Sequence, residues 1–237
     1  MPTQVHLASG LDVMCHAMES YTAIPFHLRS APPNNPIERP AYQGSNPISD
    51  VWSLKALEMV VEHLPRVVKD PSDYEAQKQM LLAATFAGIG FGNAGVHLCH
   101  AMSYPISGLN ALYRHPQYQV DHLLVPHGIS VALSAPAVFN YTSQMYPERH
   151  RRVAEILGAD MSQVKQADIG AVLSDRLRHF FQDLKVPNGI SAIGFGYNDI
   201  PGLIKGTLPQ HRVLKLAPLT TESEDLHKLF EDALTIY

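Results

Sequence analysis

The chain has 237 residues, enough for one large or two small domains, and its 46% apolar content excludes a disordered protein. Its formal net charge is −4, from 18 basic and 22 acidic residues without a basic stripe, so we expect no nucleic-acid binding. The longest mainly apolar run, residues 81–91, is about half the ~20 residues that span a bilayer, and the N-terminus shows no targeting segment.

Apolar residues recur mostly at helical spacing and strand signals are few, so we predict an all-α domain over residues 1–237. Helices are expected over about 9–21, 48–68, 73–88, 97–105, 126–141, 147–157, 167–185, 197–206 and 222–236. Pro105 should end its helix, and Pro136 should kink another. Residues 24–47 contain six prolines and predict a long irregular loop, which is typical of a functional or disordered segment.

One carboxylate and three imidazoles could form a divalent metal site. Asp12 and His16 are four residues apart, so a helix would place both on one face; His100 and His127 follow much later. Without a thiolate, Fe²⁺, Zn²⁺, Mn²⁺ and Co²⁺ all remain open. Spacing alone does not choose between His100 and His97, and with 13 histidines a chance pair is common.

Other motifs in the sequence favour packing over chemistry. The segment G-F-G-N-A-G at 90–95 matches a dinucleotide-binding pattern, but it follows an expected helix instead of a strand, so its glycines indicate close backbone packing. The only cysteines, Cys15 and Cys99, each precede a candidate ligand and point elsewhere on a helix, so we interpret both as packing residues in a reducing compartment.

A likeness to a known family is carried by seven segments of the sequence: 10–21, 39–50, 92–108, 125–133, 147–150, 154–160 and 199–210. Together they resemble the iron-containing (group III) alcohol dehydrogenases. The likeness runs over essentially the whole chain and covers only the helical C-terminal part of that family, whose fold is dehydroquinate synthase-like. A mitochondrial subgroup that transfers hydride between hydroxy acids and oxo acids is the closer match.

The resemblance implies a ligand set and a further site residue. The family's metal ligands map onto Asp12, His16, His100 and His127, which chooses His100 over His97; the implied ion is Fe²⁺, with Zn²⁺ as the alternative. Many relatives carry a histidine four residues after the third ligand, where this chain has Tyr104. We expect the phenol of Tyr104 to donate a hydrogen bond to the substrate oxygen.

The resemblance also implies a reaction: 4-hydroxybutyrate is oxidised to succinic semialdehyde, and 2-oxoglutarate is reduced to 2-hydroxyglutarate through NAD(H). Arg29 and Arg39 in the proline-rich loop, and less strongly Arg114, are candidates for binding substrate carboxylates. The family's N-terminal α/β dinucleotide-binding domain has no counterpart here. The alternatives are a metal-binding fragment or isoform without turnover, and an NAD-dependent alcohol dehydrogenase with another substrate. A homo-oligomer and a mitochondrial location are further expectations.

Overall fold

The computed structural model describes residues 1–30 and 33–237, and these residues form helices and connecting loops without a β-strand. The only bridges in this part are isolated, at Pro25–Ser45 and Arg114–Leu124. The α-helices are α1 (Thr3–Thr22), α2 (Pro47–Lys69), α3 (Tyr74–Ala94), α4 (Leu98–Gly108), α5 (His127–Ala132), α6 (Ala135–Thr142), α7 (Pro147–Ile156), α8 (Ile169–Asp183), α9 (Ile200–Thr207), α10 (His211–Leu214) and α11 (Ser223–Asp232).

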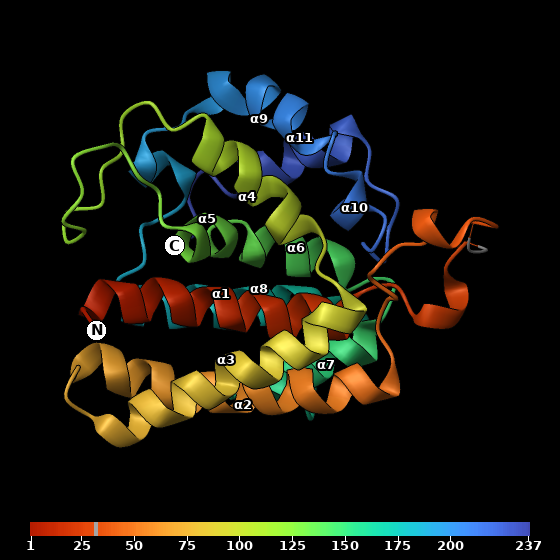
Figure 1. The fold of residues 1–237 in the computed structure, drawn as a ribbon, viewed down its shortest axis with the longest axis horizontal. Helices are drawn as coiled ribbons and strands as arrows, with labels where there is room; N and C mark the ends of the chain where they lie inside the picture. The colour runs from red at the N-terminus through yellow and green to blue at the C-terminus, as the bar shows by residue number, and fades with distance from the viewer. Residues whose placement is uncertain (31–32) are drawn as a thin grey trace.

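Helix α1 lies in the middle of the molecule, with α2 and α3 along one side and α4, α5 and α6 along the other (Figure 1). Leu11, Met14 and Met18 of α1 are fully buried between these layers. Because α1 is enclosed on both sides, its side chains extend from a fixed position.

Within the described residues no single helix is long and apolar enough to cross a membrane, although α3 and α4, which meet at 105°, pass that test as a bent pair on length and composition.

The all-α prediction is confirmed, and two predicted starts agree closely with the structure. Helix α2 begins one residue before the predicted position, at Pro47, with the side chain of Asn46 accepting from the amide of Ser49. Asp73 caps α3 as expected, accepting a hydrogen bond from the amide of Ala76. These starts were readable because capping is a local interaction.

Several predicted helix ends are wrong, because packing outweighs local preference. Helix α3 continues past Gly88 to Ala94, and a Cβ at Gly90 would lie 2.4 Å from Ser53 Oγ, so the missing side chain lets α3 approach α2. Gly88 and Gly92 have open space around them, so close packing applies to Gly90 but not to these two.

Helix α4 likewise continues past Pro105 to Gly108, with the amide of Leu109 bonded to the Pro105 carbonyl. Proline removes one hydrogen bond, and Gly206 of α9 packs against the Pro105 ring. The predicted kink at Pro136 is instead a break between α5 and α6, with Pro136 in the first turn of α6, where its missing N–H costs nothing.

The start of α1 was also predicted too late, at residue 9 instead of Thr3. Gly10 is an interior residue, and a Cβ there would lie 2.4 Å from Leu64 Cδ1 of α2. The glycine therefore marks close helix packing and not a helix end. The four-residue helix α10 was not predicted. Helix α11 ends at Asp232, four residues before its predicted end.

The segment 147–150, P-E-R-H, joins α7 to the central helix. Arg149 donates to Asp50 of α2 at 2.5 Å and to the carbonyl of Tyr21, and its guanidinium lies 3.9 Å from the centre of the Tyr21 ring. The His150 ring is buried and contacts Thr142 Oγ1 at 2.9 Å and the Tyr146 carbonyl at 2.9 Å. This motif therefore has a structural role.

Buried His150 should make the fold sensitive to acid. Burial lowers its pKa from 6.5 to about 4. The unfolded chain takes up this proton near pH 6.5, whereas the folded protein resists it down to about pH 4, so stability present above pH 6.5 is lost as the pH falls between the two values. Urea unfolding between pH 7 and 4 should show His150 contributing a decrease of up to about 3 kcal/mol, at about 1.4 kcal/mol per pH unit.

The variant His150→Gln separates this residue from other titrating groups. Its stability should fall less steeply with acid than that of the parent protein. His179→Gln is the matched control, because the His179 side chain is 60% exposed. Equal pH slopes for His150→Gln and the parent protein would contradict the assignment.

Candidate metal centre

The Asp12 carboxylate lies at the centre of a cluster of imidazoles from three helices. Asp12 Oδ1 is 3.4 Å from His100 Nε2, 3.6 Å from His127 Nε2 and 3.8 Å from His16 Nε2. Helix α1 supplies Asp12 and His16, while His100 lies in the first turn of α4 and His127 is the first residue of α5. The structure thus brings together all four residues singled out from the sequence.

Two atoms of this cluster are buried without a hydrogen-bond partner among the described residues. They are Asp12 Oδ1 and His100 Nε2, whose 3.4 Å separation lacks hydrogen-bond alignment. Buried polar atoms without partners are uncommon and costly. Ligand atoms from Asp12, His100 and His127 lie within 4.8 Å of one another, so oxygen and nitrogen donors converge as a divalent cation requires.

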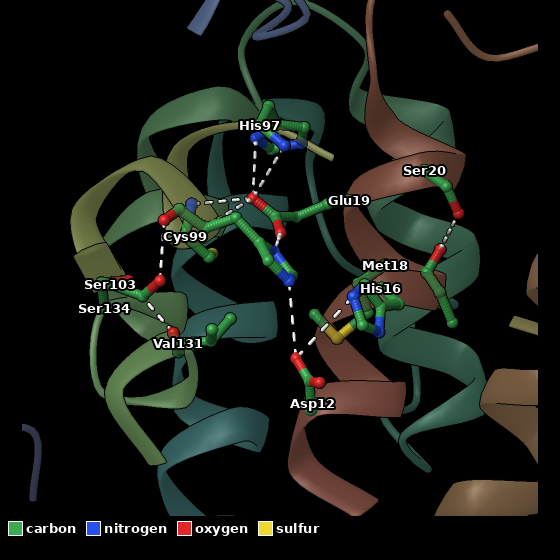
Figure 2. A network of polar contacts seen from close by, with 12 residues as sticks. Asp12, His16, Met18, Glu19, Ser20, His97, Cys99, Ser103, Val131 and Ser134 are labelled. Carbon is green, nitrogen blue, oxygen red and sulfur yellow. Dashed lines mark hydrogen bonds and ion pairs between the residues drawn. The ribbon is translucent and has the colours of Figure 1, made fainter. Parts of the chain in front are cut away.

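His16 occupies a different place in the cluster. Its ring stacks on Phe91 at 4.0 Å between centroids and on His100 at 4.6 Å. It is not among the residues whose ligand atoms converge within 4.8 Å. The His16 ring lies beside Asp12 (Figure 2), at the edge of the cluster. Its stacking on Phe91 fixes the orientation of the ring.

A buried glutamate that the sequence reasoning missed orients His100. Glu19 Oε2 contacts His100 Nδ1, while Oε1 accepts from the amides of Cys99 at 2.7 Å, His97 at 3.1 Å and His100 at 3.4 Å. Glu19 is completely buried. Its negative charge caps the start of α4, where the helix dipole is positive. With Nδ1 held, the other ring nitrogen of His100 faces Asp12. The available signal was its position, three residues after His16 on the same helix.

The charges of the cluster are set by its carboxylates. Burial opposes an imidazolium at His100, but Glu19 and Asp12 outweigh this effect and raise its pKa to about 9. Burial also opposes a charged Glu19, yet His100, His97 and the amide hydrogen bonds lower its pKa to about 2. Burial lowers the pKa of His16 to about 4. At neutral pH without metal, His100 therefore carries the proton and His16 is neutral.

Gly128 explains how His127 reaches the cluster. A Cβ on Gly128 would lie 1.7 Å from the Ala8 carbonyl oxygen and 3.0 Å from Asp12 Cβ. Only glycine lets the first turn of α5 touch the backbone of α1 at this depth. The close approach places His127, 49% exposed, at the open side of the cluster.

His97 is held apart from Asp12. Its Nε2 contacts Thr22 Oγ1 at 3.0 Å, its Nδ1 lies 3.4 Å from Glu19 Oε1, and its backbone is the N-cap of α4 (Figure 2). The ring is fully buried against the end of α1. The geometry therefore favours His100 over His97 as a ligand.

The other candidate residues lie outside the cluster. Tyr104 packs against Val96, Ala101 and Val213, and within the described residues it makes no polar contact with Asp12 or the three imidazoles. Arg29 lines a cavity of about 380 Å³ and donates to the Tyr42 carbonyl.

Arg39 and Arg114 point to neighbouring backbone. Both are exposed; Arg39 donates to the Pro33 carbonyl, and Arg114 donates to the carbonyls of Val120 and Asp121. Ala31 and Pro32 of the proline-rich loop lie outside the described residues. The loop otherwise contains 3₁₀ turns at Phe26–Leu28 and Pro36–Glu38.

Replacing Gly128 with alanine should disturb both the fold and the metal cluster. The added methyl forces α5 away from α1, so we expect a loss of about 1–3 kcal/mol in unfolding free energy. It should also weaken Zn²⁺ affinity at least about tenfold, because His127 moves with α5. Gly88→Ala is the matched control, since its Cβ meets nothing within 4 Å and alanine favours helix by up to about 1 kcal/mol. Calorimetry with Zn²⁺ measures both variants, and wild-type affinity in Gly128→Ala would refute the packing argument.

Comparison with known proteins places the chain in a family. A model of the Fe-containing alcohol dehydrogenase family, C-terminal, matches residues 37–234. The mitochondrial hydroxyacid-oxoacid transhydrogenases of Rattus norvegicus and Homo sapiens are 60% and 59% identical over all 237 residues. A crystal structure of 1,3-propanediol oxidoreductase superposes with a TM-score of 0.80 at 21% identity, covering 98% of this chain and 52% of that one.

The chain spans about half the length of the curated relatives it matches, 51% in both mammalian proteins. The family model that matches is that of the C-terminal part, as the sequence predicted. Membership implies a metal and NAD(H). The chain belongs to the iron-containing alcohol dehydrogenase family and corresponds to its C-terminal helical part.

Proposed function

We propose that this chain forms the metal-binding half of a mitochondrial hydroxyacid–oxoacid transhydrogenase. The observation that carries the proposal is a pair of buried atoms, Asp12 Oδ1 and His100 Nε2, that have no hydrogen-bond partner among the described residues and lie in a cluster of oxygen and nitrogen donors. The mammalian relatives that bear this name, at 59% and 60% identity, support the activity and the compartment.

The proposed ligands are Asp12, His16, His100 and His127. Fe²⁺ is the proposed ion, because the family is named for iron, and Zn²⁺ accepts the same donors. When bound, the cation would favour loss of the proton from a substrate hydroxyl. His16 lies at the edge of the cluster, with its Nε2 3.8 Å from Asp12 Oδ1 and its ring stacked on that of His100.

The protein's own groups prepare this site. Asp12 is ionised, because contact with His100 and the nearby imidazoles outweighs burial and lowers its pKa. Glu19 fixes the orientation of the His100 ring, and the exposed His127 marks the side from which a substrate enters. Tyr104 lies one helical turn beyond His100, and we propose that its hydroxyl donates a hydrogen bond to the substrate.

In the proposed reaction 4-hydroxybutyrate would lose a hydride and a proton and become succinic semialdehyde. 2-Oxoglutarate would gain a hydride at C2 and a proton on the oxygen and become 2-hydroxyglutarate. NAD(H), when bound, would carry the hydride from the first substrate to the second. The cofactor supplies the redox chemistry and the protein orients it. Arg29, which lines a cavity, and Arg39 remain proposed contacts for substrate carboxylates.

Metal binding should depend on His127 and not on a neighbouring exposed histidine. We expect His127→Ala to weaken Zn²⁺ or anaerobic Fe²⁺ binding by roughly 100-fold or more, since even outer groups of metal sites contribute about 10–100-fold. His122→Ala is the control, because its side chain is 65% exposed and pairs, among the described residues, with Asp121. Elemental analysis and titration calorimetry report the result. Full metal content in His127→Ala would remove it from the ligand set.

Transfer of a labelled hydride tests the function directly. Residues 1–237 joined to the remaining half of the rat relative should move deuterium from C4 of labelled 4-hydroxybutyrate to C2 of 2-hydroxyglutarate, as read by mass spectrometry. Chelation should abolish the transfer and Fe²⁺ or Zn²⁺ should restore it. Residues 1–237 alone should bind metal without transfer. Net formation of free, deuterium-labelled NADH without 2-hydroxyglutarate would indicate an ordinary alcohol dehydrogenase instead.

A further inference from the structure

A groove between α4 and α9 contains a lysine, Lys205, that has no role in the site proposed above. The groove has a volume of about 540 Å³. Its lining comes from both helices and includes Tyr104, Gly108, Leu109, Gly202, Lys205 and Gly206. Lys205 is the only charged residue of this lining, it is exposed, and it forms no ion pair with any described residue. The groove therefore offers one uncompensated positive charge.

Glycines shape the groove around this lysine. A Cβ on Gly206 would lie 2.6 Å from Pro105 Cβ, so the missing side chain allows α9 to press against α4. Gly202, one turn before Gly206, and Gly108 on α4 leave their sides of the groove without side chains. Small residues here keep the space beside Lys205 open for a slender ligand.

Tyr104 connects the groove to the metal cluster. It lines the groove, and on α4 it follows His100 by four residues, about 6 Å along the axis and on nearly the same face. Tyr104 therefore belongs both to the groove and to the side of α4 that carries His100. A ligand that extended from the cluster past Tyr104 would enter the groove that Lys205 lines, as suits a molecule whose charged end is separated from its reacting end.

The two proposed substrates share such a fragment. In 4-hydroxybutyrate the carbinol carbon is followed by two methylenes and a carboxylate, and in 2-oxoglutarate the same atoms follow the carbonyl carbon. The span from oxygen to carboxylate is roughly 5 Å, with carbon–carbon bonds of about 1.5 Å. We infer that Lys205 binds this distal carboxylate in both substrates, so that one cation positions the donor and the acceptor in turn. This inference rests on the proposed function.

Ligand binding to the Zn²⁺-loaded protein tests Lys205 without relying on turnover. Lys205→Met keeps the length of the side chain and removes its charge. We expect it to weaken binding of 4-hydroxybutyrate and of 2-oxoglutarate by about 10–100-fold each, as for loss of a charged hydrogen bond. Binding of 1-butanol, which lacks the carboxylate, should be unchanged. Lys205→Arg should restore most of the affinity. Lys78→Met is the matched control, because Lys78 is an exposed lysine of α3, which lies on the other side of α1 from α4.

The outcomes separate this inference from the function on which it rests. If the parent protein binds both acids and Lys205→Met binds them equally well, the assignment of Lys205 is wrong while the proposed function stands. If Lys205→Met weakens one acid only, the shared anchor is wrong. If the Zn²⁺-loaded parent protein binds neither acid, both the function and the inference fail. Equal weakening by Lys78→Met would show a general charge effect and would also overturn the assignment.

Discussion

The structure of the metal cluster depends on one buried carboxylate. Glu19 satisfies backbone amides at the start of α4 and holds the His100 ring at the same time. A buried charge is expensive unless it is paired and hydrogen-bonded, and here both conditions are met by a single helix end. The same carboxylate therefore stabilises the start of α4 and orients the His100 ring, so a substitution that removes this cap would also release the imidazole.

Close approach between helices is the second constraint, and at Gly128 it brings together two of the helices that form the site. Gly10 admits Leu64 against α1, Gly128 admits α5 against the same helix, and Gly206 admits α9 against Pro105 of α4. At each of these glycines, atoms of a neighbouring helix occupy the space that a side chain would fill. Ligands on short segments such as α5 are fixed by this contact and not by the length of their own helix.

Sequence reasoning predicted what is local and what a family motif carries. Helical spacing gave the fold class, Asp73 gave a cap, and the i, i+4 pair of Asp12 and His16 lies together as expected. Helix ends at Gly88 and Pro105 were wrong because tertiary packing overrides glycine and proline preferences, and no single sequence displays that packing. Glu19 was missed because its partners are residues 97–100, close in space but distant along the chain.

The proton on His100 has a consequence for the protein without its metal. Asp12 and Glu19 are both anionic, and the imidazolium between them, with a pKa of about 9, leaves the cluster with a single net negative charge. A dication bound here would displace that proton, so metal loading would exchange one cation for another between the two carboxylates. Without a metal, the imidazolium still pairs with both carboxylates, and this pairing would favour the same arrangement of the helices around α1.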